Sequence, residues 1–300
     1  MATLNPIVTA ITGYVEEHRS ELLSKAMLDG KSRRAFNLMT DVKGPTTLNI
    51  MDTNVVFGEL ACGWNESGST EFSQRTLTPK ALSVNMAFCD KKLLGTYAQY
   101  EVKVAAGMEE LPFEEKWTSQ ILDSVNEKVE HMLYFGSGSG AEFEGIVPIL
   151  SGESASTIFV NATAGTSAYA FIKAVAAKIP VKVKAPVILV STPLYREFMQ
   201  DLVAANLFHY DPANGENEYR LPGTDIRVIA VNGLIDSSLT VAIAADMDNL
   251  FYGVSADGDE DTFDLWYSKD NREFRLAIQF IAGVQVAFPD EVVLGVRANS

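Results

Sequence analysis

The chain of 300 residues, 47% of them apolar, is long enough to bury a sizeable core and to form two subdomains. Its net charge of −15 argues against a protein that grips nucleic acid by its phosphates, because such a protein needs a basic face. The sequence has no run of 18 apolar residues and no signal-peptide layout over Met1 to Ile11, so we expect a soluble chain of cytoplasmic origin without a membrane partner.

Cysteine and histidine are too sparse to predict metal chemistry. Cys62 and Cys89 are too few for a disulfide framework, and none of the three histidines has metal-ligand spacing to a cysteine. A zinc or haem site is therefore not expected.

The chain begins with a predicted helix from Pro6 to Leu28. A small basic cluster follows, made of Lys31, Arg33 and Arg34. It can be interpreted as a solvated junction between helix and loop or as a contact with an acidic neighbour. Residues 1–44 hold six basic and five acidic side chains, so the remaining chain carries a net charge of −16.

A long hairpin is predicted next. Leu48 to Phe57 is rich in β-branched and apolar residues, residues 82–88 alternate apolar with polar, and the stretch from 58 to 70 contains three glycines. An isolated hairpin is marginal in water. If this hairpin projects, Trp64 and Phe72 need a partner surface, and if it folds back they are ordinary core.

The longest predicted helix runs from Leu111 to Phe135, with Pro112 at its start and Gly136 after its last apolar residue. Its apolar side chains recur every four residues, so the apolar stripe winds slowly around the helix and can meet two layers. At about 1.5 Å per residue the helix is roughly 35–40 Å long, which predicts a spine. A long core helix of an ordinary α/β domain is the alternative. The glycine–serine run over 136–140 fits neither a phosphate loop nor a nucleophile elbow and predicts a joint.

From about residue 151 to 253 the pattern is α/β. Helices are predicted over Ser167 to Lys178 and Pro193 to Asn206, and strands over Pro186 to Val190, Asp225 to Val231 and Leu239 to Ala245. Ser191, His209 and Asp211 form a conceivable catalytic triad. Capping of the following helix explains Ser191 fully, however, and the spacing of the three residues carries no signal.

An acidic segment and antiparallel strands close the chain. Asp257, Asp259 and Asp261 alternate as in a calcium-binding EF-hand loop, but the glycine and glutamate that this loop needs are absent. We therefore expect no metal ion there. Phe263 to Tyr267 is predicted to pair with Phe274 to Phe280.

This order of elements resembles the major capsid protein of tailed bacteriophages, which has the α+β Johnson (HK-97-type) fold. The stretches that look like the family are Phe72 to Leu77, Phe88 to Leu94, Leu133 to Gly136 with Phe143 to Ile146, and Ile278 to Gly283. In the family's terms the chain divides into an N-arm (1–44), an extended loop (45–85), a peripheral domain with the spine helix (86–145 and 254–300) and an axial domain (146–253).

The resemblance implies a structural protein without enzyme activity or cofactor. It implies self-assembly as hexamers and pentamers into an icosahedral shell around double-stranded DNA, in the host cytoplasm first and in the virion afterwards. The implied partners are further copies of the chain, a scaffolding protein, a portal, a decoration protein and the packaged DNA, which is bound without sequence specificity. An acidic body suits this role because it does not adhere to the genome that it encloses.

Assembly contacts are hypothesised at Lys31, Arg33, Arg34, Trp64, Phe72, Arg75, Asp257, Asp259 and Asp261. The basic cluster would meet the acidic segment at 257–264 of a neighbour. Two other functions stay open at this point. Encapsulin, a bacterial compartment shell with the same fold, packages enzymes instead of a genome, and an α/β hydrolase would use the triad.

Two features depart from some relatives. The arm begins almost at Met1 without a long removable segment, so a separate scaffolding protein is expected. Some relatives join subunits by a lysine–asparagine isopeptide bond whose lysine lies in the extended loop, but no lysine lies between Val55 and Pro79.

Mature particles are therefore predicted to lack covalent cross-links. After boiling in denaturant they should run on a gel as a single monomer band. A ladder of multimers would contradict this prediction.

Overall fold

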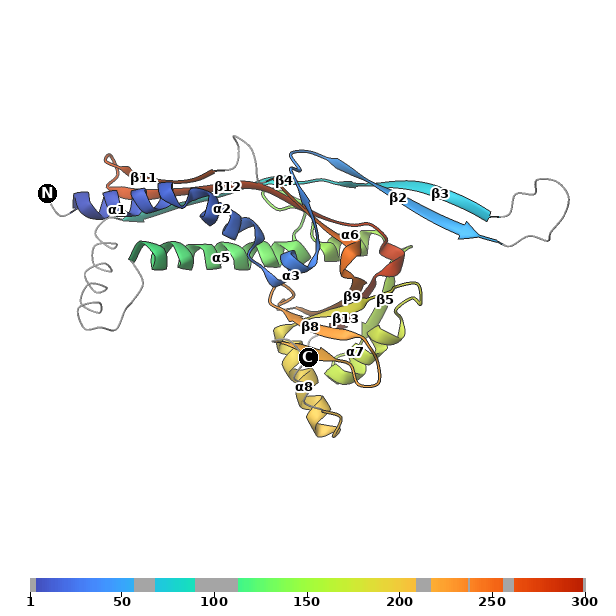
Figure 1. Cartoon of the computed structure of the whole chain (residues 1–300). Coiled ribbons are helices and arrows are strands. Elements are labelled where there is room, and N and C mark those ends of the chain that lie inside the picture. The colour runs from blue at the N-terminus through green and yellow to red at the C-terminus, as the bar shows by residue number, and fades with distance from the viewer. Residues whose placement is uncertain are drawn as a thin grey trace.

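The computed structural model describes residues 4–56, 68–89, 113–208, 217–236, 238–255 and 262–298. They form a long layered body, a hairpin that projects from one end of it, and an α/β unit beneath it (Figure 1). None of the described helices is both long enough and apolar enough to cross a membrane.

Three helices form the N-terminal segment: α1 (Leu4–Glu17), α2 (Arg19–Leu28) and α3 (Lys31–Ala35). The single helix predicted over Pro6 to Leu28 is interrupted at His18, whose φ of −104° and ψ of 14° depart from helical values. Ile11, Val15 and Leu22 are buried, so α1 and α2 still turn one apolar face to the body.

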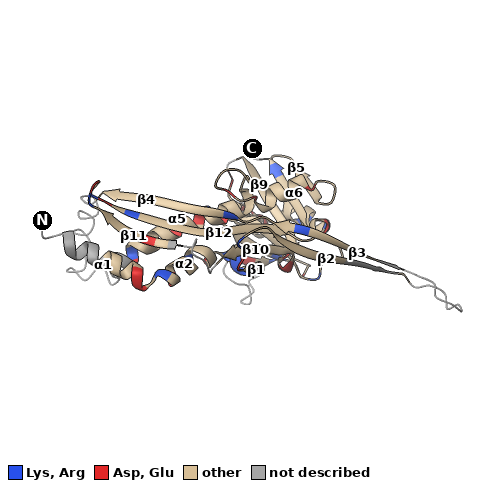
Figure 2. Ribbon diagram, turned by 90° about the horizontal axis from the view of Figure 1, so that it is seen from above, with Lys and Arg blue, Asp and Glu red and all other residues tan. Residues whose placement is uncertain are grey.

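The hairpin consists of β2 (Thr46–Val55) and β3 (Gly68–Leu77), which pair antiparallel over their full length. It stands clear of the body (Figures 1 and 2). Of the two arrangements left open by the sequence, the hairpin projects. Residues 57–67 at its tip, which include Trp64, lie outside the described residues.

The returning strand differs from the prediction. The alternating residues 82–88 belong to β4 (Lys80–Cys89), which pairs with β12 (Glu273–Val286) in the body instead of with β2. The extended loop therefore ends before the predicted residue 85. Pro79 has no N–H to donate to a ladder, and the chain leaves the hairpin there.

A five-stranded sheet forms the upper layer of the body. Its strand order is β1 (Asn37–Thr40), β10 (Leu250–Ser255), β12 and β11 (Thr262–Ser268), with β4 along the opposite side of β12. The predicted pairing of the two C-terminal strands is confirmed, with Leu265 opposite Leu276 and Phe263 opposite Ile278.

Helix α5 (Phe113–Phe135) runs beneath this sheet (Figure 1). Its stripe residues Ile121, Val125 and Val129 are buried, as the spacing of four predicts. The helix also meets a second layer, because a Cβ added at Gly233 of the α/β unit would lie 2.3 Å from the carbonyl oxygen of Glu130. Only glycine allows the two backbones to approach so closely.

The α/β unit is a six-stranded sheet with helices α7 (Ala168–Ala177) and α8 (Thr192–Ala204). In spatial order the strands are β5 (Ile158–Ala162), β13 (Val293–Ala298), β9 (Leu239–Asp246), β6 (Pro186–Ser191), β8 (Arg227–Val231) and β7 (Glu218–Arg220). Ile188 and Val190 share a core with α7 and α8, whereas Val187 and Leu189 join the core around α5 and α6 (Ile146–Gly152). Alternate residues of one strand therefore bind the two layers together.

Two C-terminal strands pair in a different sheet from the one that the predicted domain ranges imply. Residues 254–300 were assigned to the peripheral domain, yet β13 lies between β5 and β9 in the α/β unit. Conversely, β10 joins the sheet of the body from Leu250 onward. After β9 and again after β12, the chain crosses between the units at a short turn, η1 (Met247–Asn249) and η2 (Pro289–Glu291) respectively. Asn249 and Phe288 exchange two hydrogen bonds of 2.8 and 2.7 Å there, which hold the crossings side by side.

Candidate assembly surfaces

Ser191 acts as a helix cap. Its hydroxyl accepts a hydrogen bond of 3.4 Å from the backbone N–H of Leu194 in the first turn of α8, as the sequence predicts. His209 and Asp211, the other members of the conceivable triad, lie outside the described residues. Across the described ranges, no group of three or more His, Cys, Asp or Glu side chains is placed to hold a metal ion.

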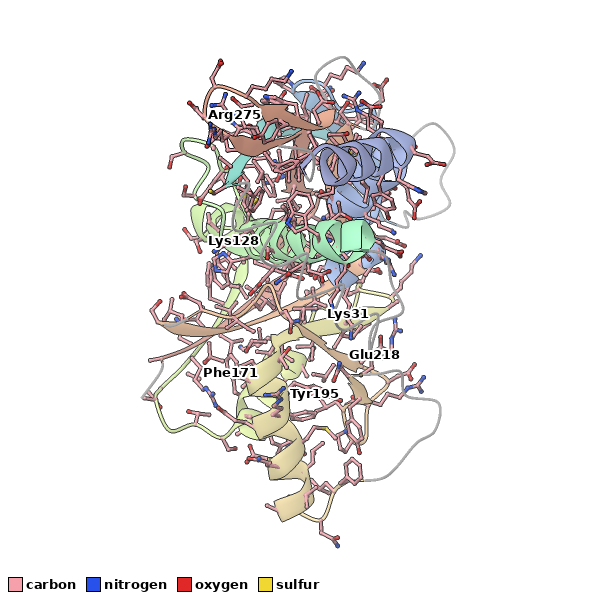
Figure 3. All side chains as sticks on the ribbon, turned by 90° about the vertical axis from the view of Figure 1, so that its left-hand side faces the viewer. Lys31, Lys128, Phe171, Tyr195, Glu218 and Arg275 are labelled. Carbon is pink, nitrogen blue, oxygen red and sulfur yellow. The ribbon has the colours of Figure 1, made fainter. Side chains whose placement is uncertain are left out.

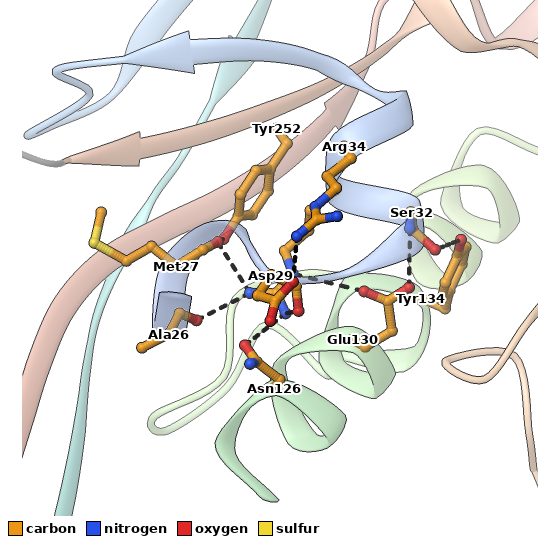
Figure 4. Close-up of polar contacts among 10 residues, drawn as sticks. Ala26, Met27, Asp29, Ser32, Arg34, Asn126, Glu130, Tyr134 and Tyr252 are labelled. Atoms are coloured by element: carbon orange, nitrogen blue, oxygen red, sulfur yellow. Dashed lines mark hydrogen bonds and ion pairs between the residues drawn. The ribbon is translucent and has the colours of Figure 1, made fainter. Parts of the chain in front are cut away.

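Arg33 of α3 is buried within its own chain, and Figure 4 labels the partners that surround it. Its Nη1 donates to the carbonyls of Ala26 and Met27 at 3.0 and 2.9 Å. Its Nη2 donates to the carbonyl of Asp29 and to Oδ1 of Asn126, both at 2.8 Å. The last carbonyls of a helix have no partner within the helix, so Arg33 satisfies the end of α2 and joins it to α5.

Glu130 of α5 supplies the matching negative charge. Its Oε2 lies 3.6 Å from Nε of Arg33, and its Oε1 accepts a hydrogen bond of 3.2 Å from the backbone N–H of Ser32. Tyr134, one turn further along α5, donates its hydroxyl to Oγ of Ser32 at 2.6 Å. Burial and the nearby Glu130 raise the pKa of Tyr134 well above its usual value, so the hydroxyl remains a donor at neutral pH. A Cβ at Gly30 would lie 2.5 Å from Oε2 of Glu130.

The three members of the basic cluster therefore have different environments. The side chain of Arg33 is fully buried and pairs with Glu130 of the same chain. This corrects the hypothesis that Arg33 contacts a neighbouring subunit. Arg34 is exposed and pairs with Asp29, and Lys31 is exposed. The assembly contacts of Arg34 and Lys31 stay predictions.

Of the acidic segment at 257–264, the predicted partner of the basic cluster, the structure describes only residues 262–264. Asp257, Asp259 and Asp261 lie outside the described residues, so their contact with a neighbour stays a prediction. Asp264 forms an ion pair of 2.9 Å with Arg19 of α2, within the same chain. Both side chains are about half exposed, and such a pair contributes little to stability.

The hairpin carries an exposed apolar pair near its middle. Phe72 on β3 is 79% exposed, and Met51, directly opposite on β2, is 61% exposed. Opposite residues of an antiparallel pair point to the same face, so Met51 and Phe72 form one apolar knob. Arg75, closer to the body, is mostly buried and donates to Glu153 beyond the end of α6 at 3.2 Å. Arg75 thus anchors the base of the hairpin within its own chain.

An apolar groove of about 390 Å³ lies between β4 and α5. Its walls include Leu82, Val84 and Met86 from β4 and Ile121, Val125 and Val129 from α5, and we call it the β4–α5 groove. Lys128 lies on its rim. Figure 3 shows Lys128 on the side of α5 opposite α1 and α2, so the N-terminal segment does not cover the groove.

No protein-family model matches the chain. No curated protein matches it either. Solved structures match along most of its length. A chain of the satellite phage P4 procapsid, a structure that includes the size determination (Sid) protein, has a TM-score of 0.61 and 10% identity, covering 93% of this chain and 91% of that one.

Two further structures agree. A chain of Gordonia phage Cozz has a TM-score of 0.57 and 14% identity over 90% of this chain and 86% of its own. A chain of the capsid of Myoviridae phage XM1 has a TM-score of 0.53 and 10% identity over 88% and 90%. The chain has the HK-97-type capsid fold.

The segment predicted as N-arm (1–44) contains α1–α3 and β1, the predicted extended loop (45–85) contains β2, β3 and the first part of β4, and the predicted spine helix is α5. The assignment of these segments to the family's domains stays a prediction. Asn126, Glu130 and Tyr134 have no place among the predicted site residues, yet all three bind the end of the N-arm. Their spacing of four forms a polar stripe beside the apolar one. Because buried polar groups need partners, that stripe was the available signal for a contact.

Replacing Arg33 tests the anchor between N-arm and spine helix. Arg33→Met leaves Glu130 buried without its positive partner, so the free energy of unfolding in urea should fall by about 3–5 kcal/mol. Arg34→Met is the matched control, because its exposed pair with Asp29 is worth about 0–1 kcal/mol. A loss in Arg33→Met no larger than in the control would rule the anchor out.

Proposed function

We propose that the chain is the major capsid protein of a tailed phage. It self-assembles as hexamers and pentamers into an icosahedral shell that encloses double-stranded DNA. The observation that carries this proposal is the HK-97-type capsid fold, which matches phage procapsid and capsid structures over 88% to 93% of the chain.

The projecting hairpin supports a role in assembly. A two-stranded hairpin is marginal when isolated in water, and its apolar knob of Met51 and Phe72 faces solvent in the single chain. Exposed apolar surface on a projection is typical of a contact with another protein. Further copies of the same chain meet this requirement in a closed shell.

The charge supports a shell that encloses DNA without adhering to it. The net charge of −15 opposes phosphate binding, so the packaged DNA is held by enclosure and not by sequence-specific contacts. A structural role of this kind needs no enzyme activity and no cofactor.

The same proposal includes further partners and a location. A scaffolding protein directs assembly, a portal admits the DNA, and a decoration protein binds the finished shell where one is used. The chain is then found in the host cytoplasm during assembly and in the virion afterwards.

Expression of the chain alone and together with a candidate scaffolding protein tests the proposal. Sedimentation and electron microscopy of the heavy fraction should reveal closed icosahedral shells, hexamers or pentamers. A monomer or dimer under every condition would refute the proposal. DNA inside native particles separates a phage capsid from an encapsulin, which would contain an enzyme.

A further inference from the structure

The loop between α7 and β6 forms a basic surface on an acidic chain. Residues 154–196 contain four lysines and one arginine but no Asp or Glu, whereas the chain as a whole has a net charge of −15. Three of these lysines, Lys178, Lys182 and Lys184, lie in residues 178–185, which we call the lysine loop, and all three are exposed. The structure describes residues 113–208 without a gap, so the loop and both neighbouring elements are described.

The lysine loop is anchored by contacts within the chain. The side chain of Val183 is buried, and its backbone N–H donates to the carbonyl of Pro180 at 3.1 Å. Nζ of Lys182 forms an ion pair with Asp290 and another, of 3.3 Å, with Glu291, both in η2. A loop that is already ordered loses little conformational entropy when a partner binds, so this loop suits a docking surface.

Two lysines and a valine of the loop remain free for a partner. No carboxylate of the described residues pairs with Lys178 or Lys184, unlike Lys182. Val181 is fully exposed, more than any other large apolar side chain in the described ranges. A single exposed apolar side chain is ordinary on a protein surface, and the helix dipole favours a lysine after α7. Neither effect explains Lys184, or why the valine lies between two unpaired lysines.

The charge of the loop selects an anionic partner, and Val181 selects among anionic partners. DNA phosphates would contact the lysines but leave the valine exposed, and the loop has no arginine or aromatic side chain for contacts with bases. A long polyanion would also lie against the acidic remainder of the chain, which repels it. A short protein segment, in contrast, can place carboxylates on Lys178 and Lys184 and an apolar side chain on Val181.

We propose that the lysine loop is a docking site for an acidic segment of a partner protein. The segment carries carboxylates on both sides of an apolar side chain, which packs on Val181. Salt screens the attraction between exposed charges, so the contact weakens as the ionic strength rises. This inference goes beyond the proposed function and does not depend on it, because the loop and its anchoring contacts lie within one chain.

Binding of a labelled acidic peptide to the full chain tests the proposal. The probe is a synthetic peptide with the sequence of residues 255–264, which contains five carboxylate side chains and one phenylalanine. Fluorescence anisotropy should report saturable binding that weakens as salt is added. A control peptide with Asn and Gln in place of the acidic residues should not bind.

Variants of the chain locate the binding site. Lys178→Gln with Lys184→Gln should weaken binding of the peptide about tenfold, because it removes both unpaired charges of the loop. Lys128→Gln with Lys269→Gln, two exposed lysines of the body, is the control with the same change of charge and should bind within about twofold of the wild type. Val181→Ser should weaken binding about threefold to tenfold, because less apolar area is buried.

Three results would overturn the docking site: no binding of the acidic peptide to the wild-type chain, equal affinities in the loop variant and the control variant, or tighter binding of a short DNA duplex that Val181→Ser leaves unchanged. All the substituted side chains are exposed, so the circular dichroism spectra should agree with that of the wild type. Assembly into shells is measured separately, so the failure of either proposal leaves the other standing.

Discussion

The contact of the Arg33 guanidinium with α5 is the constraint on which the rest of the subunit depends. It satisfies the carbonyls at the end of α2, and with Glu130 it fixes the turn into α3 against the middle of the spine helix. A buried ion pair of this kind gains little stability over an apolar pair of the same shape. We interpret its role as specificity, because three directional hydrogen bonds join the N-terminal segment to α5: Arg33 to Asn126, the backbone N–H of Ser32 to Glu130, and Tyr134 to Ser32.

The spine helix supports three parts of the molecule at once. Its apolar stripe packs against the five-stranded sheet, and its polar residues Asn126, Glu130 and Tyr134 bind the N-terminal segment. Its backbone lies close to Gly233 of the α/β unit. The body is consequently complete within one chain. The projecting hairpin is not, because it stands clear of the body and exposes Met51 and Phe72 to solvent.

Periodicity in the sequence predicts the local elements well. The spacing of four places α5 within two residues of its observed start, and the alternation of the C-terminal strands predicts their pairing. The failures are non-local. β3 contains Ser, Thr, Gln and Arg with few apolar residues, so its sequence does not alternate clearly. The regular alternation of β4 therefore led to β4 being predicted as the second strand of the hairpin. The burial of Arg33 depends on Glu130, 97 positions further along the chain, and β13 joins a sheet whose other strands lie far back in the sequence. A local sequence pattern cannot predict contacts between residues so far apart in the chain.

Hydrogen exchange of the isolated subunit and of assembled particles tests the division between a complete body and an incomplete hairpin most directly. We predict that amides of residues 26–35 and of α5 are protected equally in both states, because their contacts lie within one chain. Amides of residues 46–55 and 68–77 should exchange quickly in the subunit and slowly in the particle. A hairpin already protected in the subunit, or an N-arm junction protected only after assembly, would contradict this division.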